Sequence, residues 1–255
     1  MASSGVVDGL DLENTTIPMP PCAGCGYGKH QRSPFLTGPT RATYTGQLIH
    51  SDLCGPMEKS TPNGCLYFVL FIDDYSGFRF IFFLKAQSEA ADYFKDLINI
   101  TRGETGNLVR TFRTDGGGEW SSSDFGTWLT GKGIRHKTSA PHTPQQDGVS
   151  ERGIRTITKG ARSCLHDCFP TSELGGGGTK RLVEDVRLPT YFGAEAASYV
   201  VYTLNRVLSK VSPITPFEAW TNKRPNLLHL RSFGSIDFLH IPKPERKKLD
   251  QKRMR

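Results

Sequence analysis

The sequence predicts an α/β fold in which a mixed, five-stranded sheet carries helices on its faces. Two observations lead to this prediction. Three consecutive runs rich in aromatic and β-branched residues indicate neighbouring strands, and the runs that follow alternate between helical and extended patterns. The expected strands are 47–55, 66–74, 78–84, 109–114 and 134–138.

Four helices are expected between and after these strands. Ser88 is placed to cap the first, whose apolar residues recur on one face. The second covers 122–130, and the third begins near Val149. The fourth follows Pro189 and is apolar almost all round, which predicts burial. Between the last two helices, four glycines at 175–178 indicate a flexible joint.

Composition points to a folded protein with a polyanionic partner. The chain has 255 residues, 36% hydrophobic and 22% charged, with a formal net charge of +7. The segment 243–255 holds seven Lys/Arg against two acids. A solvated, mobile end is an equally good interpretation of that segment.

Membrane insertion is not expected, because no apolar run is long enough to span a bilayer. The six cysteines lack the spacing of a secreted disulfide framework, which favours reduced thiols in the cytosol or nucleus. Cys22 and Cys25 form a Cys-x-x-Cys pair, which supplies half of a tetrahedral zinc site.

Three carboxylates are the candidate catalytic residues. Asp52 lies in the first expected strand, Asp115 ends the fourth before three glycines, and Glu151 lies in the first turn of the third helix. Carboxylates that converge need cations between them, and paired Mg²⁺ ions suit in-line attack on a phosphodiester. Each acid also has an ordinary explanation, as a strand-end acid, a turn former or a helix N-terminal charge. The combination of the three is what favours the metal site.

The helix that carries Glu151 also presents a row of cations. At 100° per residue, Arg155, Lys159 and Arg162 fall within about 80° of Glu151, and the apolar residues cluster on a separate arc. This row, called the cation ladder below, suits a phosphate backbone. The alternative is a solvated helix face with a Glu151–Arg155 pair one turn apart.

The segments IHSDLCGPM, YFVLFIDDYSGFRFIFFLK, FRTDGGGEW and SAPHTPQQDGVSERGIRTI resemble the integrases of copia-class retrotransposons. Asp52, Asp115 and Glu151, with 35 residues between the last two, are similar to the D,D-35-E triad of that family. The resemblance implies a ribonuclease-H-like fold and catalysis of DNA integration with two Mg²⁺ or Mn²⁺ ions held by the triad.

The same resemblance implies partners and further contacts. Element ends and target DNA are the expected partners, the protein is expected to form a homo-oligomer, and the nucleus is the expected location after synthesis in the cytoplasm. Expected DNA-binding residues are the cation ladder together with His142 and Gln146 of the loop before it. Gly193 stands where the family has a bulky aromatic residue, so core volume is expected to be missing there.

Three regions are expected along the chain: a remnant of an amino-terminal zinc module at 1–40, the catalytic core at 41–210, and a segment at 211–255 leading into an incomplete carboxy-terminal β module with a basic tail. No paired histidines precede Cys22 and Cys25, so we expect these thiols to bind zinc weakly or not at all. The chain is thus expected to be a fragment or relic of an integrase, truncated at both ends.

Three functions compete on this basis. The leading one is metal-dependent end processing and strand transfer of element DNA. A nuclease or transposase of the ribonuclease H superfamily is chemically similar, but the QQDGVSERG loop argues against it. The third is a nucleic-acid-binding remnant without catalysis.

Overall fold

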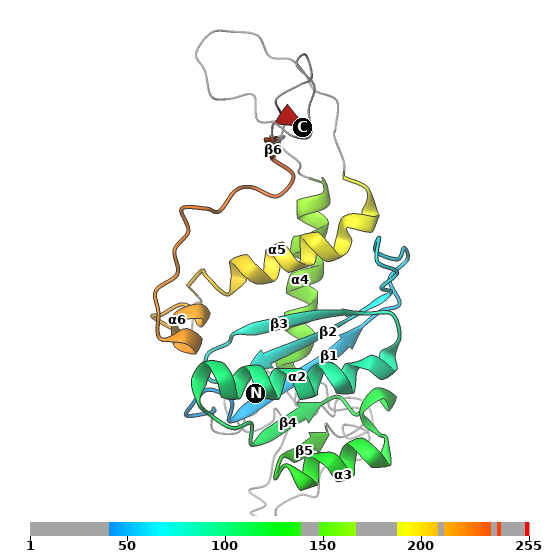
Figure 1. Ribbon diagram of the computed structural model, residues 1–255, viewed down its shortest axis with the longest axis vertical. Coiled ribbons are helices and arrows are strands. Elements are labelled where there is room, and N and C mark those ends of the chain that lie inside the picture. Colours follow the sequence, from blue (N-terminus) through cyan, green and yellow to red (C-terminus); the bar gives the residue numbers. More distant parts are fainter. Residues whose placement is uncertain are drawn as a thin grey trace, which may run out of the picture. The chain divides into compact units, whose positions relative to one another are not determined.

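A computed structural model describes residues 41–138, 148–166, 188–208 and 212–235, and two short strands at 239–240 and 253–254. Its main sheet has five strands in the order β3-β2-β1-β4-β5 (Figure 1). β1–β2 and β2–β3 pair antiparallel, whereas β1–β4 and β4–β5 pair parallel. The strands are β1 (Leu48–Cys54), β2 (Tyr67–Asp73), β3 (Arg79–Leu84), β4 (Thr111–Thr114) and β5 (Arg135–Thr138). The mixed, five-stranded sheet expected from the sequence is confirmed.

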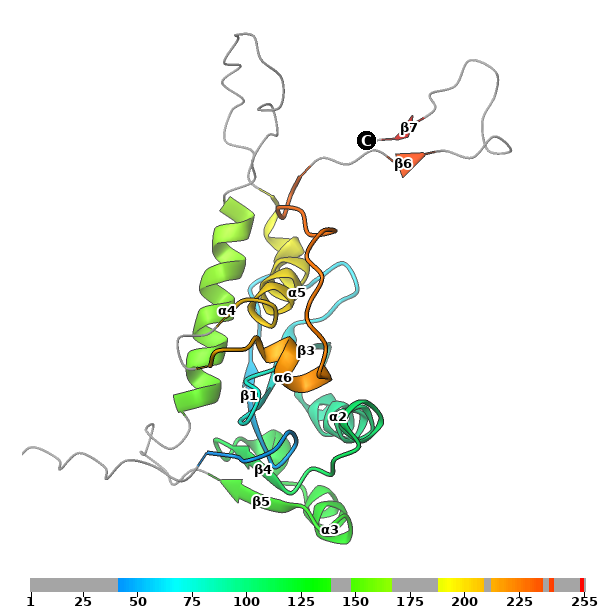
Figure 2. The same ribbon diagram turned by 90° about the vertical axis from the view of Figure 1, so that its left-hand side faces the viewer.

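Helices cover both faces of this sheet, and Figure 2 shows α4 on one side with α2 and α3 on the other. The α-helices are α2 (Ala90–Thr105), α3 (Ser123–Gly131), α4 (Gly148–His166), α5 (Gly193–Leu204) and α6 (Pro216–Thr221). Short 3-10 helices are η2 (Gln87–Glu89), η3 (Gly118–Trp120) and η4 (Thr190–Phe192), and β6 (Leu239–His240) pairs antiparallel with β7 (Arg253–Met254). None of the helices in the described ranges is long and apolar enough to cross a membrane.

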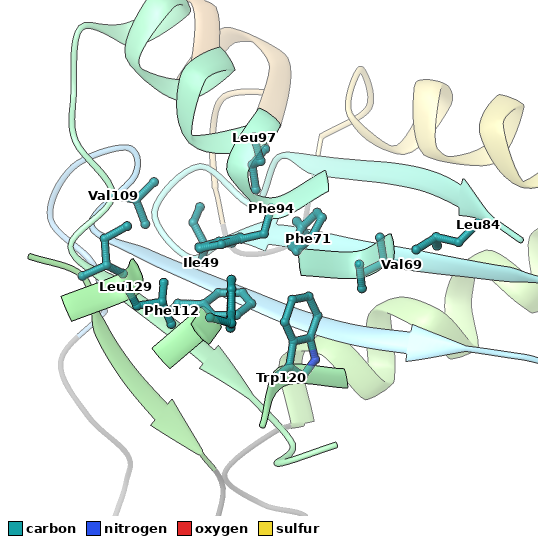
Figure 3. Close-up of a cluster of buried hydrophobic side chains, with 13 residues drawn as sticks. Ile49, Val69, Phe71, Leu84, Phe94, Leu97, Val109, Phe112, Trp120 and Leu129 are labelled. Atoms are coloured by element: carbon teal, nitrogen blue, oxygen red, sulfur yellow. The ribbon is translucent and has the colours of Figure 1, made fainter. Parts of the chain in front are cut away.

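Each face of the sheet has its own hydrophobic core. On the α2/α3 face, Phe71 and Phe112 pack against Phe94 of α2 and Trp120 of η3 (Figure 3). On the other face, Leu70 and Ile72 of β2 pack with residues of α4 and α5. Because strand side chains alternate between faces, β2 contributes to both cores in turn.

Two expectations about helices need correction. Ser88 does not cap α2: it lies inside η2, and the N-cap of α2 is Glu89, which makes no side-chain capping bond. The apolar run after Pro189 begins as η4, and α5 exposes Glu195 and Ser198 on its outer side. By contrast, Ser122 caps α3 as its position suggests, because its hydroxyl oxygen accepts a hydrogen bond from the Phe125 N–H.

Gly193 opens α5, and a Cβ built on it would meet no atom within 4 Å. A side chain is therefore sterically tolerated at this position. The expectation that core volume is missing there stays a prediction.

α4 lies directly on β2 at a glycine. A Cβ on Gly153 would come within 2.6 Å of Ile72 Cδ1 and 2.9 Å of Leu70 Cδ2. Ile72 and Leu70 are themselves 3% and 0% exposed, so they have little room to move away. Gly153 therefore sets how closely the first turns of α4 approach the sheet.

Two consecutive aspartates at the end of β2 hold the segment that leads into β1. Asp73 is fully buried and accepts hydrogen bonds from the Gly46 N–H and from the N–H and hydroxyl of Ser76. Asp74 accepts from the Ala42 N–H at 2.8 Å and lies 3.0 Å from Nε2 of the buried His50. Both carboxylates therefore fix the start of β1 from the neighbouring strand.

The pKa values of the two aspartates shift in opposite directions. Burial raises the pKa of Asp73 above its ordinary value of 3.8, although the hydrogen bonds from Ser76 and Gly46 oppose this. Burial also acts to raise the pKa of Asp74, but the hydrogen bonds from His50 and Ala42 and the charges of His50 and Arg41 outweigh it, so this pKa is lowered.

Gly153→Ala should destabilise the protein by about 1–3 kcal/mol, because the added methyl group overpacks the α4–β2 contact. Gly126→Ala in α3 is the matched control, since a Cβ there meets no atom within 4 Å. Better helix propensity should stabilise that variant by about 0.5–1 kcal/mol. Urea unfolding measures both, and equal effects of the two substitutions would show that the α4 contact is loose.

Asp74→Asn should be less stable than the parent by about 1–2 kcal/mol at neutral pH, since one acceptor and a charge are lost. A lowered folded-state pKa contributes stability above the ordinary value of 3.8 that is lost as the pH falls through the folded pKa. The deficit should therefore shrink below about pH 4. For Asp73→Asn the loss of stability should instead be larger at low pH. The pKa of Asp73 is raised, so the folded state favours its protonated form. Unfolding curves between pH 3 and 7 test this, and pH-independent deficits would contradict it.

Candidate metal centre and nucleic-acid interface

The pairing of β1 with β4 brings two of the three candidate acids together. The two strands run parallel, with His50 opposite Arg113. Continuing this register by two residues places Asp52 opposite Asp115, which follows the last residue of β4. Neighbouring strands are about 4.8 Å apart. The backbone therefore presents both aspartates side by side at the same end of the sheet.

Asp52 belongs to the face of the sheet that α4 covers. Ile49 packs in the core on the α2/α3 side, and Asp52 follows it by three residues in β1, so strand alternation directs it to the opposite face. Asp115 is the first residue after β4. The β2 partner of Asp52 is Leu70, which packs with α4 and α5.

The third acid arrives at this face on α4. Glu151 lies in the first turn of α4, two residues before Gly153. Gly153 contacts Leu70, and Leu70 is the strand neighbour of Asp52. Gly153 lies about 200° round the helix from Glu151, so its contact with β2 positions the start of α4 and not the Glu151 side chain. Asp52 is half-buried, and Asp115 and Glu151 are exposed.

Carboxylate oxygens are the ligands that hard divalent cations prefer, so the donor set of Asp52, Asp115 and Glu151 suits Mg²⁺ or Mn²⁺. In the parts of the chain that the structure describes, however, no three His, Cys, Asp or Glu side chains form a group that could hold a metal ion. Like charges brought this close repel one another. Shared metal binding by the three acids therefore stays a prediction.

Glu119, which sequence reasoning did not single out, lies close to Gly117, two residues after Asp115. The Gly117 N–H donates to Asp115 Oδ1 at 2.9 Å, which orients the Asp115 carboxylate. Both carboxylate oxygens of Glu119 lie 2.5 Å from where a Cβ on Gly117 would be. Gly117 has an ordinary φ of −55°, so the backbone does not require a glycine there. A side chain at 117 would displace the flexible carboxylate of Glu119.

The cation ladder lies on the exposed side of α4. Arg155, Lys159 and Arg162 are all exposed, whereas Ile157 and Ala161 of the same helix are buried. Among the described residues, Glu151 and Arg155 form no ion pair, so the alternative of a paired, solvated face lacks its main interaction.

Sequence reasoning missed another cation at the start of α4. The guanidinium group of Arg152 folds back onto Gly148, where Nη1 lies 2.6 Å from the position of a Cβ. A wheel diagram places residues by angle alone and gives no sign of a side chain that folds back along the axis.

Four predicted residues lie outside the part of the chain that the structure describes. They are the candidate zinc ligands Cys22 and Cys25 and the candidate DNA contacts His142 and Gln146. Their roles stay predictions, as do the three regions expected along the chain.

A hollow of about 420 Å³ lies at the other end of β1, away from the acids. It is bounded by the segment before β1, the turn after β2, the end of α2, and α6, and its lining includes Tyr44, Tyr75, Asn107, Glu218 and Trp220. The candidate metal centre is thus an open surface at one end of the sheet and not this hollow.

Comparisons with known proteins agree with this arrangement. Residues 42–144 match the family described as "Integrase core domain". The chain is 36% identical over 243 residues to the Retrovirus-related Pol polyprotein from transposon TNT 1-94 of Nicotiana tabacum, covering 94% of this chain and 17% of that protein. It is 26% identical over 244 residues to the Pol polyprotein from transposon RE1 of Arabidopsis thaliana, covering 95% of this chain and 15% of that protein.

A solved structure supports the fold. A chain in the cryo-EM structure of the simian T-cell lymphotropic virus intasome in complex with PP2A regulatory subunit B56 gamma matches with a TM-score of 0.57 at 18% identity, covering 91% of this chain and 74% of that one. The expected ribonuclease-H-like fold is confirmed. This chain spans less than a fifth of the length of the two Pol polyproteins. Residues 42–144 are thus similar to an integrase core domain, and most of the chain is similar to a segment of the Pol polyproteins of plant retrotransposons.

Proposed function

We propose that this protein catalyses metal-dependent DNA integration, joining the ends of copia-class retrotransposon DNA to target DNA. The observation that supports the proposal is the parallel β1–β4 register, because its continuation beyond His50 and Arg113 would bring Asp52 opposite Asp115, while Glu151 lies in the first turn of α4. The similarity to an integrase core domain supports the same role.

The reaction is the exchange of one phosphodiester bond for another. In end processing a water oxygen attacks phosphorus, and in strand transfer the 3′-hydroxyl of the element attacks a target phosphodiester. In both, the bond from phosphorus to the leaving oxygen breaks. Asp52, Asp115 and Glu151 would hold two divalent ions, Mg²⁺ or Mn²⁺, which activate the attacking oxygen and stabilise the leaving one.

The residues of α4 would bind and orient the DNA. The cation ladder lies on the exposed surface that begins at Glu151, so a phosphate backbone bound along it would pass the acids. We further propose that the protein acts as a homo-oligomer in the nucleus, since integration joins two element ends to chromosomal DNA.

A second function, nucleic-acid binding without catalysis, is favoured by one observation. Among the described residues, no group of three candidate ligands could hold a metal ion. The two functions differ in whether a divalent metal changes the DNA product.

Asp52→Asn, Asp115→Asn and Glu151→Gln should each lower metal-dependent product by about a hundredfold or more, because each removes a metal ligand. The assay joins a labelled duplex to plasmid DNA in Mg²⁺ or Mn²⁺. Glu195→Gln is the matched control, since Glu195 is an exposed acid in the first turn of α5 and should leave the product unchanged. Metal-independent DNA binding by a parent chain that forms no product would favour the second function instead.

Lys159→Gln should weaken binding to all DNA sequences similarly and lower the slope of log K against log salt by about 1, because one phosphate contact is lost. Stability should change by less than about 0.5 kcal/mol. The control is Lys95→Gln on α2, an exposed lysine paired with Asp92 on the other side of the sheet. Titrations without divalent metal measure both, and an unchanged slope for Lys159→Gln would make the ladder an ordinary solvated face.

A further inference from the structure

The β4–β5 half of the sheet carries cations on the face away from α3. On the α3 side, Phe112 of β4 stacks on His136 of β5, and both rings lie beside α3. Strand alternation therefore directs Arg113, Arg135 and Lys137 to the other face. The helices on that side pack further along the sheet, since α4 packs on β1 and β2 and α5 packs on β3 (Figures 1 and 2).

These three residues, called the sheet patch below, form a cluster of cations with no acid among them. Arg113 is the register partner of Lys137, and Arg135 comes two residues before Lys137 on β5. Each Cα atom is therefore about 5–7 Å from its nearest neighbour in the patch. Arg135 and Lys137 are exposed and Arg113 is half-buried. None of the three forms an ion pair or a side-chain hydrogen bond with another described residue.

This arrangement is unfavourable in the protein alone. Like charges on neighbouring strands repel one another, and Arg113 lies directly opposite Lys137. Charged residues on an edge strand commonly prevent pairing with a second sheet, which would account for Arg135 and Lys137 of β5. It does not account for Arg113, because β4 lies between β1 and β5. A bound polyanion would offset the repulsion, since all three cations would attract it.

The sheet patch begins beside the candidate metal centre. Arg113 is two residues before Asp115, and its partner on β1 is His50, two residues before Asp52. From Arg113 the patch extends to the edge of the sheet at β5. The cation ladder, by contrast, lies on α4. Two groups of cations on different elements thus begin within a few residues of the candidate acids.

We propose that the sheet patch binds the phosphate backbone of a second DNA duplex while the cation ladder holds the first. The proposal rests on the function proposed above, in which two DNA molecules must meet at the same acids. A single row of cations follows a single backbone, so the ladder leaves the second duplex without a binding surface. DNA carries one negative charge per about 1.7 Å of its axis, which complements a cluster of unpaired cations. Phosphate contacts carry no sequence information, so the second duplex can have any sequence.

The first arm of the test measures capture of a second duplex by the full chain, without divalent metal. The chain is saturated with one immobilised duplex, and a labelled duplex of unrelated sequence is then titrated at several salt concentrations. Arg135→Gln and Lys137→Gln should each lower the slope of log K against log salt for the second duplex by about 1, because one phosphate contact is lost. Binding of the first duplex should be unchanged. Lys159→Gln on the ladder should do the reverse.

Two further variants control for charge in the first arm. Lys137→Arg should keep the slope of the parent chain, because it keeps the positive charge. Lys132→Gln removes one exposed lysine close in sequence to the patch, but Lys132 is the C-cap of α3, on the other side of the sheet. It should leave capture of the second duplex unchanged, and a loss equal to that of Lys137→Gln would show that only net charge matters.

The second arm separates DNA binding from a structural role. In the protein without DNA, Lys137→Gln should unfold at the same or a higher urea concentration than the parent chain, because repulsion from Arg113 is relieved. A photoreactive residue placed at 137 should cross-link the second duplex and not the first, whereas the same residue placed at 132 should cross-link neither.

Equal loss of both duplexes in the patch variants, an unchanged salt slope, or a lower urea midpoint for Lys137→Gln would overturn the proposal. None of these measurements requires a reaction product. A chain that captures the second duplex through the patch but forms no metal-dependent product would refute the proposed integration activity and keep the patch as a DNA-binding surface. A chain that forms product equally well after Arg135→Gln and Lys137→Gln would keep the activity and refute the patch.

Discussion

The parallel register between β1 and β4 is the constraint on which the candidate metal centre depends. Side chains alternate along a strand, so a slip of one residue would put Asp52 and Asp115 on opposite faces of the sheet. Ile49 of β1 and Phe112 of β4 are register partners, and both are fully buried in the same core. Moving either to the α4 face would exchange a buried apolar group for a polar one. The hydrophobic core on one face thereby fixes the positions of the acids on the other.

β2 also influences the position of Glu151, because α4 packs on this strand. Leu70 is at once the strand partner of Asp52 and part of the surface on which Gly153 lies. A larger residue at 153 would lift the start of α4, which carries Glu151, away from β2. His50 and the aspartates that end β2 hold β1 from the other side, two residues before Asp52. The positions of all three acids therefore depend on close packing at a distance from them.

Sequence reasoning succeeded where periodicity carries the information. The strands and helices follow from apolar patterns, whereas the 35-residue spacing marks Asp115 and Glu151 only through the family resemblance. It failed at side-chain conformation. GGGEW and GVSER both look like turn and helix-start sequences, and neither pattern shows that the charged groups of Glu119 and Arg152 lie close to Gly117 and Gly148. Ser88 failed for a related reason, since the chain forms η2 before α2 and leaves that hydroxyl outside the cap position.

Three carboxylates would repel the phosphates of bound DNA, and the cations along α4 would offset this repulsion. At physiological salt, exposed charges act over about 8 Å, so a cation must lie near each phosphate that it attracts. From Arg155 to Arg162 the helix rises about 10 Å, which corresponds to roughly three base-pair steps of DNA. Binding and reaction can therefore involve different phosphates. The ladder can bind phosphates that lie too far from the acids to be repelled by them.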